Sequence, residues 1–238
     1  MPPKANKVIK FKAPTNKTKT IKANATNSLN QATPESNTST NMGEESGTDA
    51  VFFWRETHPD TGYLSQWYAC PFRDGDNPNL IYKTAENYMM YQKAVLFGDT
   101  QVASEILKTG NPRKVKSLGR KVRNFDEAVW NRERERVVYE GNILKFTTAL
   151  SEEDITRGNC PGSPLVGESL RALLLSTGDR ELVEASPFDR VWGVGFTERF
   201  AEERRDEWGL NLLGKALMRV REQFRKEDEE REREKSTA

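Results

Sequence analysis

The sequence is poor in the residue types that hold metal ions. Histidine occurs once, at His58, and cysteine twice, at Cys70 and Cys160, with no CxxC pair. A zinc site uses three or four Cys, His or carboxylate ligands at recognisable spacing, so we expect neither zinc nor another metal cofactor. His58 precedes Pro59 in a turn-like segment and is expected to be an ordinary surface residue. Carboxylates, lysines, aromatic rings and the backbone remain as the groups available for chemistry.

Disulfide frameworks, long apolar runs and excess charge are absent as well. Two cysteines with no signal peptide before them favour a reducing interior, the cytosol or the nucleus. No uninterrupted apolar run approaches about 18 residues, so no transmembrane helix is expected. The 37 basic and 36 acidic residues among 238 give a net charge of +1. Affinity for nucleic acid therefore cannot rest on net charge, although a local basic patch can supply it.

Composition divides the chain into three regions. Residues 1–50 hold one aromatic residue, Phe11, and their first half carries seven lysines with no acid. Such a segment cannot bury enough apolar surface to order itself, so we expect a disordered Lys-rich tail. The tail can contact DNA or RNA, serve as an import signal, or simply be solvated. Residues 51–225 have the size of one compact domain, and residues 226–238 form a charged C-terminal extension.

The domain is expected to be mainly α-helical with a few short β-strands. Thr84, Asp99 and Asp126 are typical N-cap residues, and they predict helices through about residues 97, 108 and 147. A short helix should follow Pro112, another should start at Ser163-Pro164, and a Leu-rich turn should cover residues 170–175. The last long helix should run from about residue 198, or from 210, to about 225. Short strands are expected at residues 51–55, 80–83 and 182–185, without the strand–helix alternation of a Rossmann-like sheet.

The first candidate for chemistry lies in the helix predicted after Thr84. Glu86 and Lys93 are seven residues apart, so they face the same side of the helix, roughly 10 Å apart along its axis. A carboxylate and an amine then share a stripe with Met89 and Met90, at the spacing that normally faces a core. The alternative is a surface pair that flanks buried methionines, or two side chains whose stems are buried and whose charges reach water.

Two further segments are candidates for ligand contact. The loop from Ser186 to Gly195 places Asp189 three residues before Trp192, among prolines and glycines that let a ligand approach the backbone. The alternatives are a surface ion pair with the next residue and an indole buried in the core. The segment 209–214 contains Asn211 and Gly214, which can serve as a helix cap and a close-packing residue, or can contact a ligand.

The order of these segments resembles the YbiA-like or NADAR domains. That family combines an aromatic first strand, a helix of the form T-x-E-x-Y-x-x-x-Q-K, a D-x-x-W-G loop and an N-x-L-G helix start. The matching residues here are Phe53, Gly62 to Ser65, Glu86, Tyr88, Gln92, Lys93, Trp130, Leu170 to Leu174, Leu182 to Glu184, Asp189, Trp192, Gly193, Asn211, Leu213 and Gly214. The resemblance covers residues 51–225.

The resemblance implies a mainly α fold and hydrolysis of the bond between a ribose and an amino nitrogen. Family members act on phosphoribosylamino-pyrimidine intermediates of riboflavin synthesis, or remove ADP-ribose from the amino group of guanine in nucleic acid. By resemblance the catalytic residues are Glu86, Lys93, Asp189 and Trp192, with no cofactor. The expected substrate contacts are Phe53, Leu64, Ser65, Tyr88, Trp130, Gly193 and Asn211.

These residue types suit the reaction, and three functions stay open: a hydrolase, a binding domain and a scaffold. Two carboxylates can supply an acid–base group and a negative charge beside the ribosyl cation, while an unprotonated Lys93 can form a Schiff base that water hydrolyses. A domain that binds ADP-ribose-like nucleotides without hydrolysing them is the alternative function. A nucleic-acid-associated scaffold that uses the lysine tail is the third. The oligomeric state does not follow from the sequence.

Overall fold

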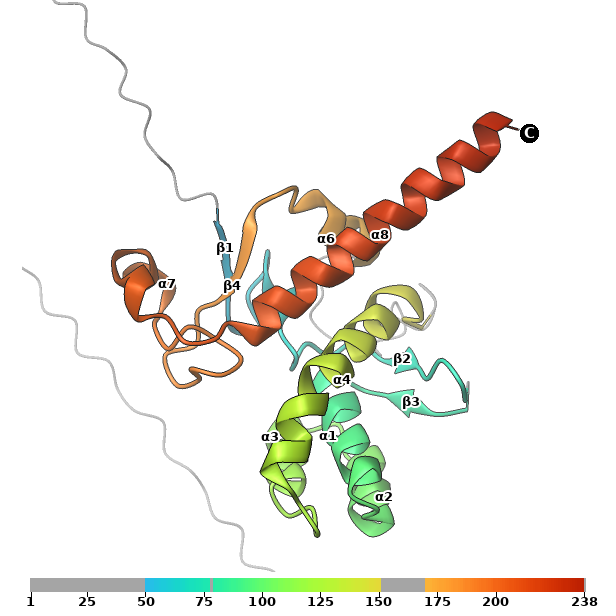
Figure 1. Ribbon diagram of the computed structural model, residues 1–238. Helices are drawn as coiled ribbons and strands as arrows, with labels where there is room; N and C mark the ends of the chain where they lie inside the picture. The colour runs from blue at the N-terminus through green and yellow to red at the C-terminus, as the bar shows by residue number, and fades with distance from the viewer. Residues whose placement is uncertain (1–49, 78, 151–169, 238) are drawn as a thin grey trace, which may run out of the picture. The chain divides into compact units, whose positions relative to one another are not determined.

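The computed structural model describes residues 50–77, 79–150 and 170–237 (Figure 1). The described part is mainly helical with four short strands, as expected. The elements are β1 (Ala50–Phe53), η1 (Gly62–Leu64), β2 (Phe72–Arg73), β3 (Ile81–Tyr82), α1 (Ala85–Leu96), α2 (Thr100–Lys108), α3 (Pro112–Gly119), α4 (Glu127–Thr147), α6 (Leu170–Ser176), β4 (Glu181–Glu184), α7 (Glu198–Ala201), η3 (Glu202–Glu207) and α8 (Leu212–Thr237).

The strands form two sheets of two strands each, one antiparallel and one parallel. β2 and β3 make an antiparallel pair close in sequence, whereas β1 and β4 are parallel and far apart in sequence. In that parallel pair Phe53 lies opposite Glu184. Because parallel strands end at the same edge, the segments that follow β1 and β4 emerge side by side, and α8 packs on β4 (Figure 1).

The starts of three helices follow the predicted N-caps. The side chains of Thr84, Asp99 and Asp126 each accept a hydrogen bond from the backbone N–H three residues on, at 3.1, 3.2 and 2.8 Å. Each bond satisfies one of the N–H groups that a helix start leaves without a partner. The predicted beginnings of α1, α2 and α4 are therefore confirmed. The helix expected at Ser163-Pro164 lies outside the described residues.

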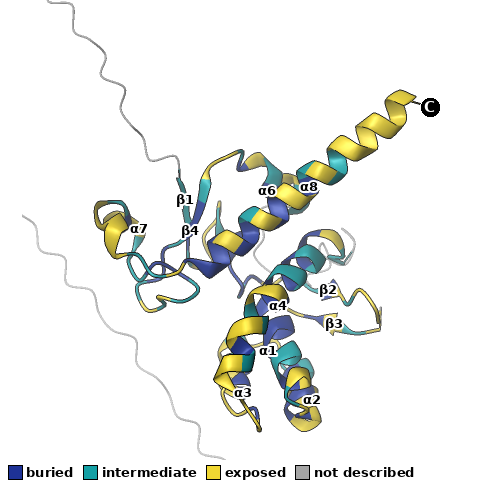
Figure 2. Ribbon diagram, in the orientation of Figure 1, coloured by how far each residue is buried: buried dark blue, intermediate teal, exposed yellow. Residues whose placement is uncertain are grey.

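The C-terminal helix departs from the expectation. The chain from residue 198 forms the short α7 and η3, and the long helix α8 begins only at Leu212 and continues to Thr237, beyond the expected end near 225. A Cβ at Gly209 would overlap the Arg190 carbonyl oxygen. The backbone at Gly209 therefore lies directly against the backbone of Arg190 before α8 starts. The last turns of α8 are exposed (Figure 2). Within the described ranges no helix has both the length and the apolar character needed to cross a membrane.

A buried lysine holds the turn after β1. Lys145 of α4 is fully buried, and its Nζ donates hydrogen bonds to the carbonyl oxygens of Tyr63, at 2.6 Å, and Ser65, at 3.0 Å. Burial lowers the pKa of this amine to about 8. The bonds fix η1 and the start of the segment that leads into α1.

The start of α8 is packed tightly on β4. A Cβ at Gly214 would overlap the Leu182 carbonyl oxygen, so only glycine lets the helix approach the strand this closely. Next to it, Asn211 adopts a left-handed backbone conformation with φ 48°. Its Nδ2 donates to the Leu182 carbonyl oxygen at 3.0 Å, and its Oδ1 accepts from the Glu184 N–H at 3.1 Å. In this segment Gly214 therefore allows close packing of α8 on β4, and Asn211 binds the backbone of β4.

Gly214→Ala tests this packing. The added methyl group would meet backbone of β4 that cannot turn aside, so the free energy of unfolding should fall by about 3 kcal/mol, which exceeds the small gain in helix propensity. Gly119→Ala is the matched control, because there the overlap is with the flexible side chain of Met90. Urea denaturation of both variants measures the difference. Equal stabilities of the two variants would contradict this account.

Candidate active site

The segments that follow β1 and β4 enclose a cavity of about 250 Å³, together with α1 and α3. We call it the carboxylate cavity. Its lining consists of Trp54, Arg55, Glu56, Ser65, Gln66, Trp67, Glu86, Met89, Lys116, Glu184, Ser186, Phe188, Asp189 and Trp192. The structure thus brings together Glu86, Asp189, Trp192 and Ser65, which the sequence singled out separately.

Glu86 lies in the first turn of α1 and is almost fully buried at 6% exposure. Its N–H donates to the Gln66 carbonyl oxygen at 2.9 Å, while its Oε1 is buried with no hydrogen-bond partner among the described residues. Burial raises the pKa of this carboxyl to about 7, opposed chiefly by the charge of Lys116 and by a hydrogen bond from Trp67. At neutral pH the group therefore exchanges readily between its acid and base forms.

Asp189 lies at the start of a tight loop that turns back onto β4. Its Oδ1 accepts hydrogen bonds from the backbone N–H groups of Val191, at 3.0 Å, and Trp192, at 2.8 Å. These bonds set the direction of the carboxylate. A Cβ on Gly193 would lie 2.6 Å from the Glu184 carbonyl oxygen, so glycine is needed where the loop meets the strand. Gly193 shapes the loop through its backbone.

Glu184 is a further carboxyl in the cavity, and the sequence did not indicate it as a site residue. It is the last residue of β4, and its buried Oε2 has no hydrogen-bond partner within the described ranges. Burial raises its pKa to about 8, the Asp189 charge adds to this, and the Lys116 charge opposes it. The signal that points to it is its place at the carboxyl end of a buried strand, where ligand sites commonly form.

Lys116 is the second residue that the sequence did not indicate. It lies on α3, a helix rich in exposed basic side chains, and it is half-buried where it lines the cavity. Its positive charge lowers the pKa of both Glu86 and Glu184. Nothing in its local sequence distinguishes it from the neighbouring lysines and arginines, because only the packing of α3 on α1 turns it toward the carboxyls.

Lys93 is not among the residues that line the carboxylate cavity. Its Nζ lies over the ring of Phe125, 4.0 Å from the centroid, and 5.6 Å from that of Trp130. Desolvation lowers the pKa of the amine from its usual value. The structure therefore separates this amine from the lining that contains Glu86, two helical turns earlier. Its catalytic role stays a prediction.

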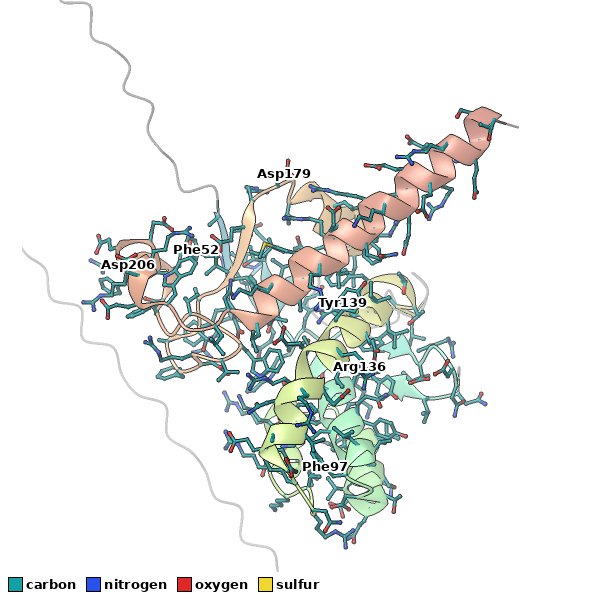
Figure 3. All side chains as sticks on the ribbon, viewed as in Figure 1. Phe52, Phe97, Arg136, Tyr139, Asp179 and Asp206 are labelled. Carbon is teal, nitrogen blue, oxygen red and sulfur yellow. The ribbon has the colours of Figure 1, made fainter. Side chains whose placement is uncertain are left out.

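The other predicted contacts lie in three different surroundings. Phe53, Leu64 and Trp130 are buried in the hydrophobic core. Tyr88 lines a separate cavity of about 660 Å³. Arg136 and Tyr139 of α4, which Figure 3 labels, also line this cavity. Asn211 holds β4 in the manner described above. Their substrate contacts stay predictions, and the positions of Phe53 and Leu64 are those of packing residues.

The cavity combines carboxyls with a lysine and an indole. Throughout residues 50–77, 79–150 and 170–237 no group of three or more His, Cys, Asp or Glu residues is arranged to hold a metal ion. The arrangement provides two carboxyls with raised pKa, Glu86 and Glu184, and the carboxylate of Asp189, which backbone N–H groups align. It also provides the positive charge of Lys116 and the indole of Trp192. Such a site can donate a proton and stabilise a developing positive charge.

Comparison with known proteins agrees with the resemblance seen in the sequence. The N-glycosidase R617 of Acanthamoeba polyphaga mimivirus is 38% identical over 179 residues, which are 73% of this chain and 95% of that protein. The Riboflavin biosynthesis protein PYRR of Zea mays, a chloroplastic protein, is 29% identical over 161 residues, 65% of this chain but 21% of the relative.

Both the sequence and the fold of YbiA resemble those of this chain. The N-glycosidase YbiA of Escherichia coli strain K12 is 28% identical over 177 residues, 74% of this chain and 89% of the relative. The NMR structure of the E. coli protein YbiA aligns with a TM-score of 0.53 at 26% identity, and the alignment covers 76% of this chain and 88% of that one. The family model of the NADAR domain matches residues 52–225, from β1 into α8. The chain therefore belongs to the NADAR domain family.

Proposed function

We propose that this protein is a hydrolase that cleaves the N-glycosidic bond between a ribose and an amino nitrogen. The observation that carries the proposal is the gathering of Glu86, Glu184, Asp189 and Trp192 around one cavity. The names of the relatives R617 and YbiA, both N-glycosidases, support it. Water is the second substrate, and the reaction as proposed uses no cofactor.

Glu86 is the general acid of the proposed reaction. Cleavage of the bond between C1′ and the nitrogen leaves an electron pair on the nitrogen, which takes the proton from the Glu86 carboxyl. A pKa of about 7 keeps a large fraction of this carboxyl protonated at neutral pH. Asp189 stabilises the positive charge that develops on the ribose, since its Oδ1 is already held by two backbone N–H groups.

Water completes the reaction and restores the enzyme. A water molecule attacks C1′, and one of its protons passes to the Glu86 carboxylate that the first step left behind. The products are the free sugar hemiacetal and the free amine, so the net change is the addition of one water. Trp192 supplies a flat apolar surface on which the base of the substrate stacks.

A second route passes through Lys93. The lowered pKa of this amine, half-buried over aromatic rings, increases the fraction that is unprotonated and nucleophilic. In this route the amine attacks the anomeric carbon of the ring-opened riboside, the amine of the substrate leaves, and water hydrolyses the Schiff base. The route requires Lys93 to reach a carbon held beside the carboxylate cavity, which the amine does not line.

The substrate is proposed to be one of two ribosylated amines. One is ADP-ribose on the guanine amino group of nucleic acid, and the other is a phosphoribosylamino-pyrimidine of riboflavin synthesis, which the name of the maize relative favours. The seven lysines in the first half of residues 1–50 favour nucleic acid and a place of action in the cytoplasm or nucleus. Binding of ADP-ribose without hydrolysis is the alternative function.

Glu86→Gln and Asp189→Asn test the two carboxyl roles. Each change keeps the shape of the side chain and removes its charge or its acid–base function, so turnover should fall by about 100-fold or more. Glu105→Gln, on the exposed face of α2, is the control and should keep full activity. Release of free sugar from ADP-ribosylated guanine DNA and from the pyrimidine ribotide measures turnover. Full activity of both variants at the cavity would overturn this mechanism.

Borohydride trapping distinguishes the two routes. If Lys93 forms a Schiff base, reduction during turnover leaves a sugar covalently bound to the wild-type protein and none on Lys93→Ala. If water attacks directly, neither protein gains the mass of a sugar. Intact-mass spectrometry of both proteins after reduction reads out the result. An adduct of equal yield on Lys93→Ala would contradict the lysine route.

A further inference from the structure

Helix α3 and the turn after it carry a concentration of positive charge that the chain as a whole lacks. Residues 112–123 contain six basic residues and no acidic residue, whereas the net charge of the chain is +1. The six are Arg113, Lys114, Lys116, Arg120, Lys121 and Arg123. Lys116 is half-buried and the other five are exposed, on a helix whose outer side is open to solvent (Figure 2). A local basic patch of this kind attracts anions regardless of the net charge.

Most of these cations have no carboxylate partner. Within residues 50–77, 79–150 and 170–237, Arg123 is the only one of the six in an ion pair, with Asp99 at 2.6 Å. On α4, by contrast, Arg136 lies 2.8 Å from both Glu133 and Glu140. The cations of α3 are therefore available to an external anion. A run of closely spaced cations fits the repeated phosphates of a nucleic-acid strand.

One row of these cations leads to the carboxylate cavity. Lys116 and Arg120 follow Arg113 by three and seven residues, so the three share a face of the helix. That face lies opposite the buried Val115 and Leu118. Lys116 lines the cavity, and the charges of Lys116 and Arg120 lower the pKa of Glu86. The basic face of α3 is therefore continuous with the candidate active site.

The size of the cavity restricts the form of nucleic acid that can react there. Its volume of about 250 Å³ is below the ~300–1,000 Å³ of typical ligand pockets, so stacked base pairs cannot enter it. A base that carries a ribosyl group on its amino nitrogen must leave any stack to bring that bond to Glu86. Leaving the stack costs least in a single strand. The backbone of such a strand stays outside the cavity, where the cations of α3 lie.

We propose that the basic face of α3 is a docking surface for the phosphate backbone of a single-stranded nucleic acid. We call it the α3 surface, and its exposed cations are Arg113, Lys114, Arg120 and Lys121. The strand runs along the helix, and the modified base turns past Lys116 into the cavity. The proposal rests on the proposed function and selects, of its two substrates, the one attached to a strand. A pyrimidine ribotide has one phosphate and cannot span a row of cations roughly 10 Å long.

Fluorescence anisotropy with an unmodified single-stranded DNA oligonucleotide, measured over a series of salt concentrations, tests the α3 surface in the full chain. The triple variant Arg113→Gln/Lys114→Gln/Lys121→Gln removes three charges. Its affinity should fall by about 10-fold or more, and the slope of log K against log salt should become shallower by about 2. These side chains are exposed and do not line the cavity, so the fold and the carboxyls stay as they are.

Lys215→Gln/Arg219→Gln/Lys235→Gln is the matched control, because it removes three charges from exposed positions of α8. It should bind the oligonucleotide as wild type does. The lysines of residues 1–50 are present in all three proteins, so a difference between the two variants belongs to α3. Equal affinities and equal salt slopes of the two triple variants would overturn the α3 surface, as would absence of binding by wild type.

Sugar release separates the α3 surface from the proposed reaction. With ADP-ribosylated guanine in a DNA strand, the α3 variant should show a raised KM and an unchanged kcat. With ADP-ribosylated guanosine, which has no strand, both constants should match those of wild type. Hydrolysis whose KM for the strand is the same in variant and wild type refutes only the surface. Binding of DNA that depends on α3, without any sugar release, refutes only the proposed reaction.

Discussion

The desolvation of the Glu86 carboxyl is the constraint on which the site depends. Burial in the first turn of α1 raises its pKa from 4.5 to about 7 and leaves one of its oxygens without a described partner. The protonated form therefore stabilises the fold, and this contribution, on the order of 3 kcal/mol, is lost as pH rises from 4.5 through 7. A fold that accepts this cost at neutral pH has other packing that compensates for it, and the cost is typical of a site kept for chemistry.

The surrounding structure positions Glu86 and brings a second glutamate to the same cavity. The buried Lys145 fixes the turn that precedes the Gln66 carbonyl oxygen, which accepts the N–H of Glu86. The parallel pairing of β1 with β4 brings Glu184 to the same edge as Trp54, and Asn211 clamps the backbone of that glutamate. The Asp189 charge adds to burial in raising the pKa of both Glu86 and Glu184, and the Lys116 charge lowers both.

The starts of several helices could be predicted from the sequence, because an N-cap residue and its hydrogen bond lie within a few residues of one another. Thr84, Asp99 and Asp126 cap the helices that the sequence assigned to them. The site was predictable only in part. Glu86 and Asp189 stand out by their residue type and motif, whereas Lys116 and Glu184 enter the cavity only through long-range packing. Lys93 shares a helix face with Glu86, yet its distance along the axis carries it to the rings of Phe125 and Trp130.

The proposed reaction requires that a large fraction of Glu86 is a protonated carboxylic acid at neutral pH. Carbon-13 NMR of protein labelled at the glutamate side-chain carboxyl follows this ionisation directly, and the signal missing from the spectrum of Glu86→Gln identifies the residue. The midpoint of this titration should lie near pH 7. A midpoint at the ordinary glutamate value of 4.5 would contradict it, because the carboxyl would then be an ion at neutral pH and no proton donor.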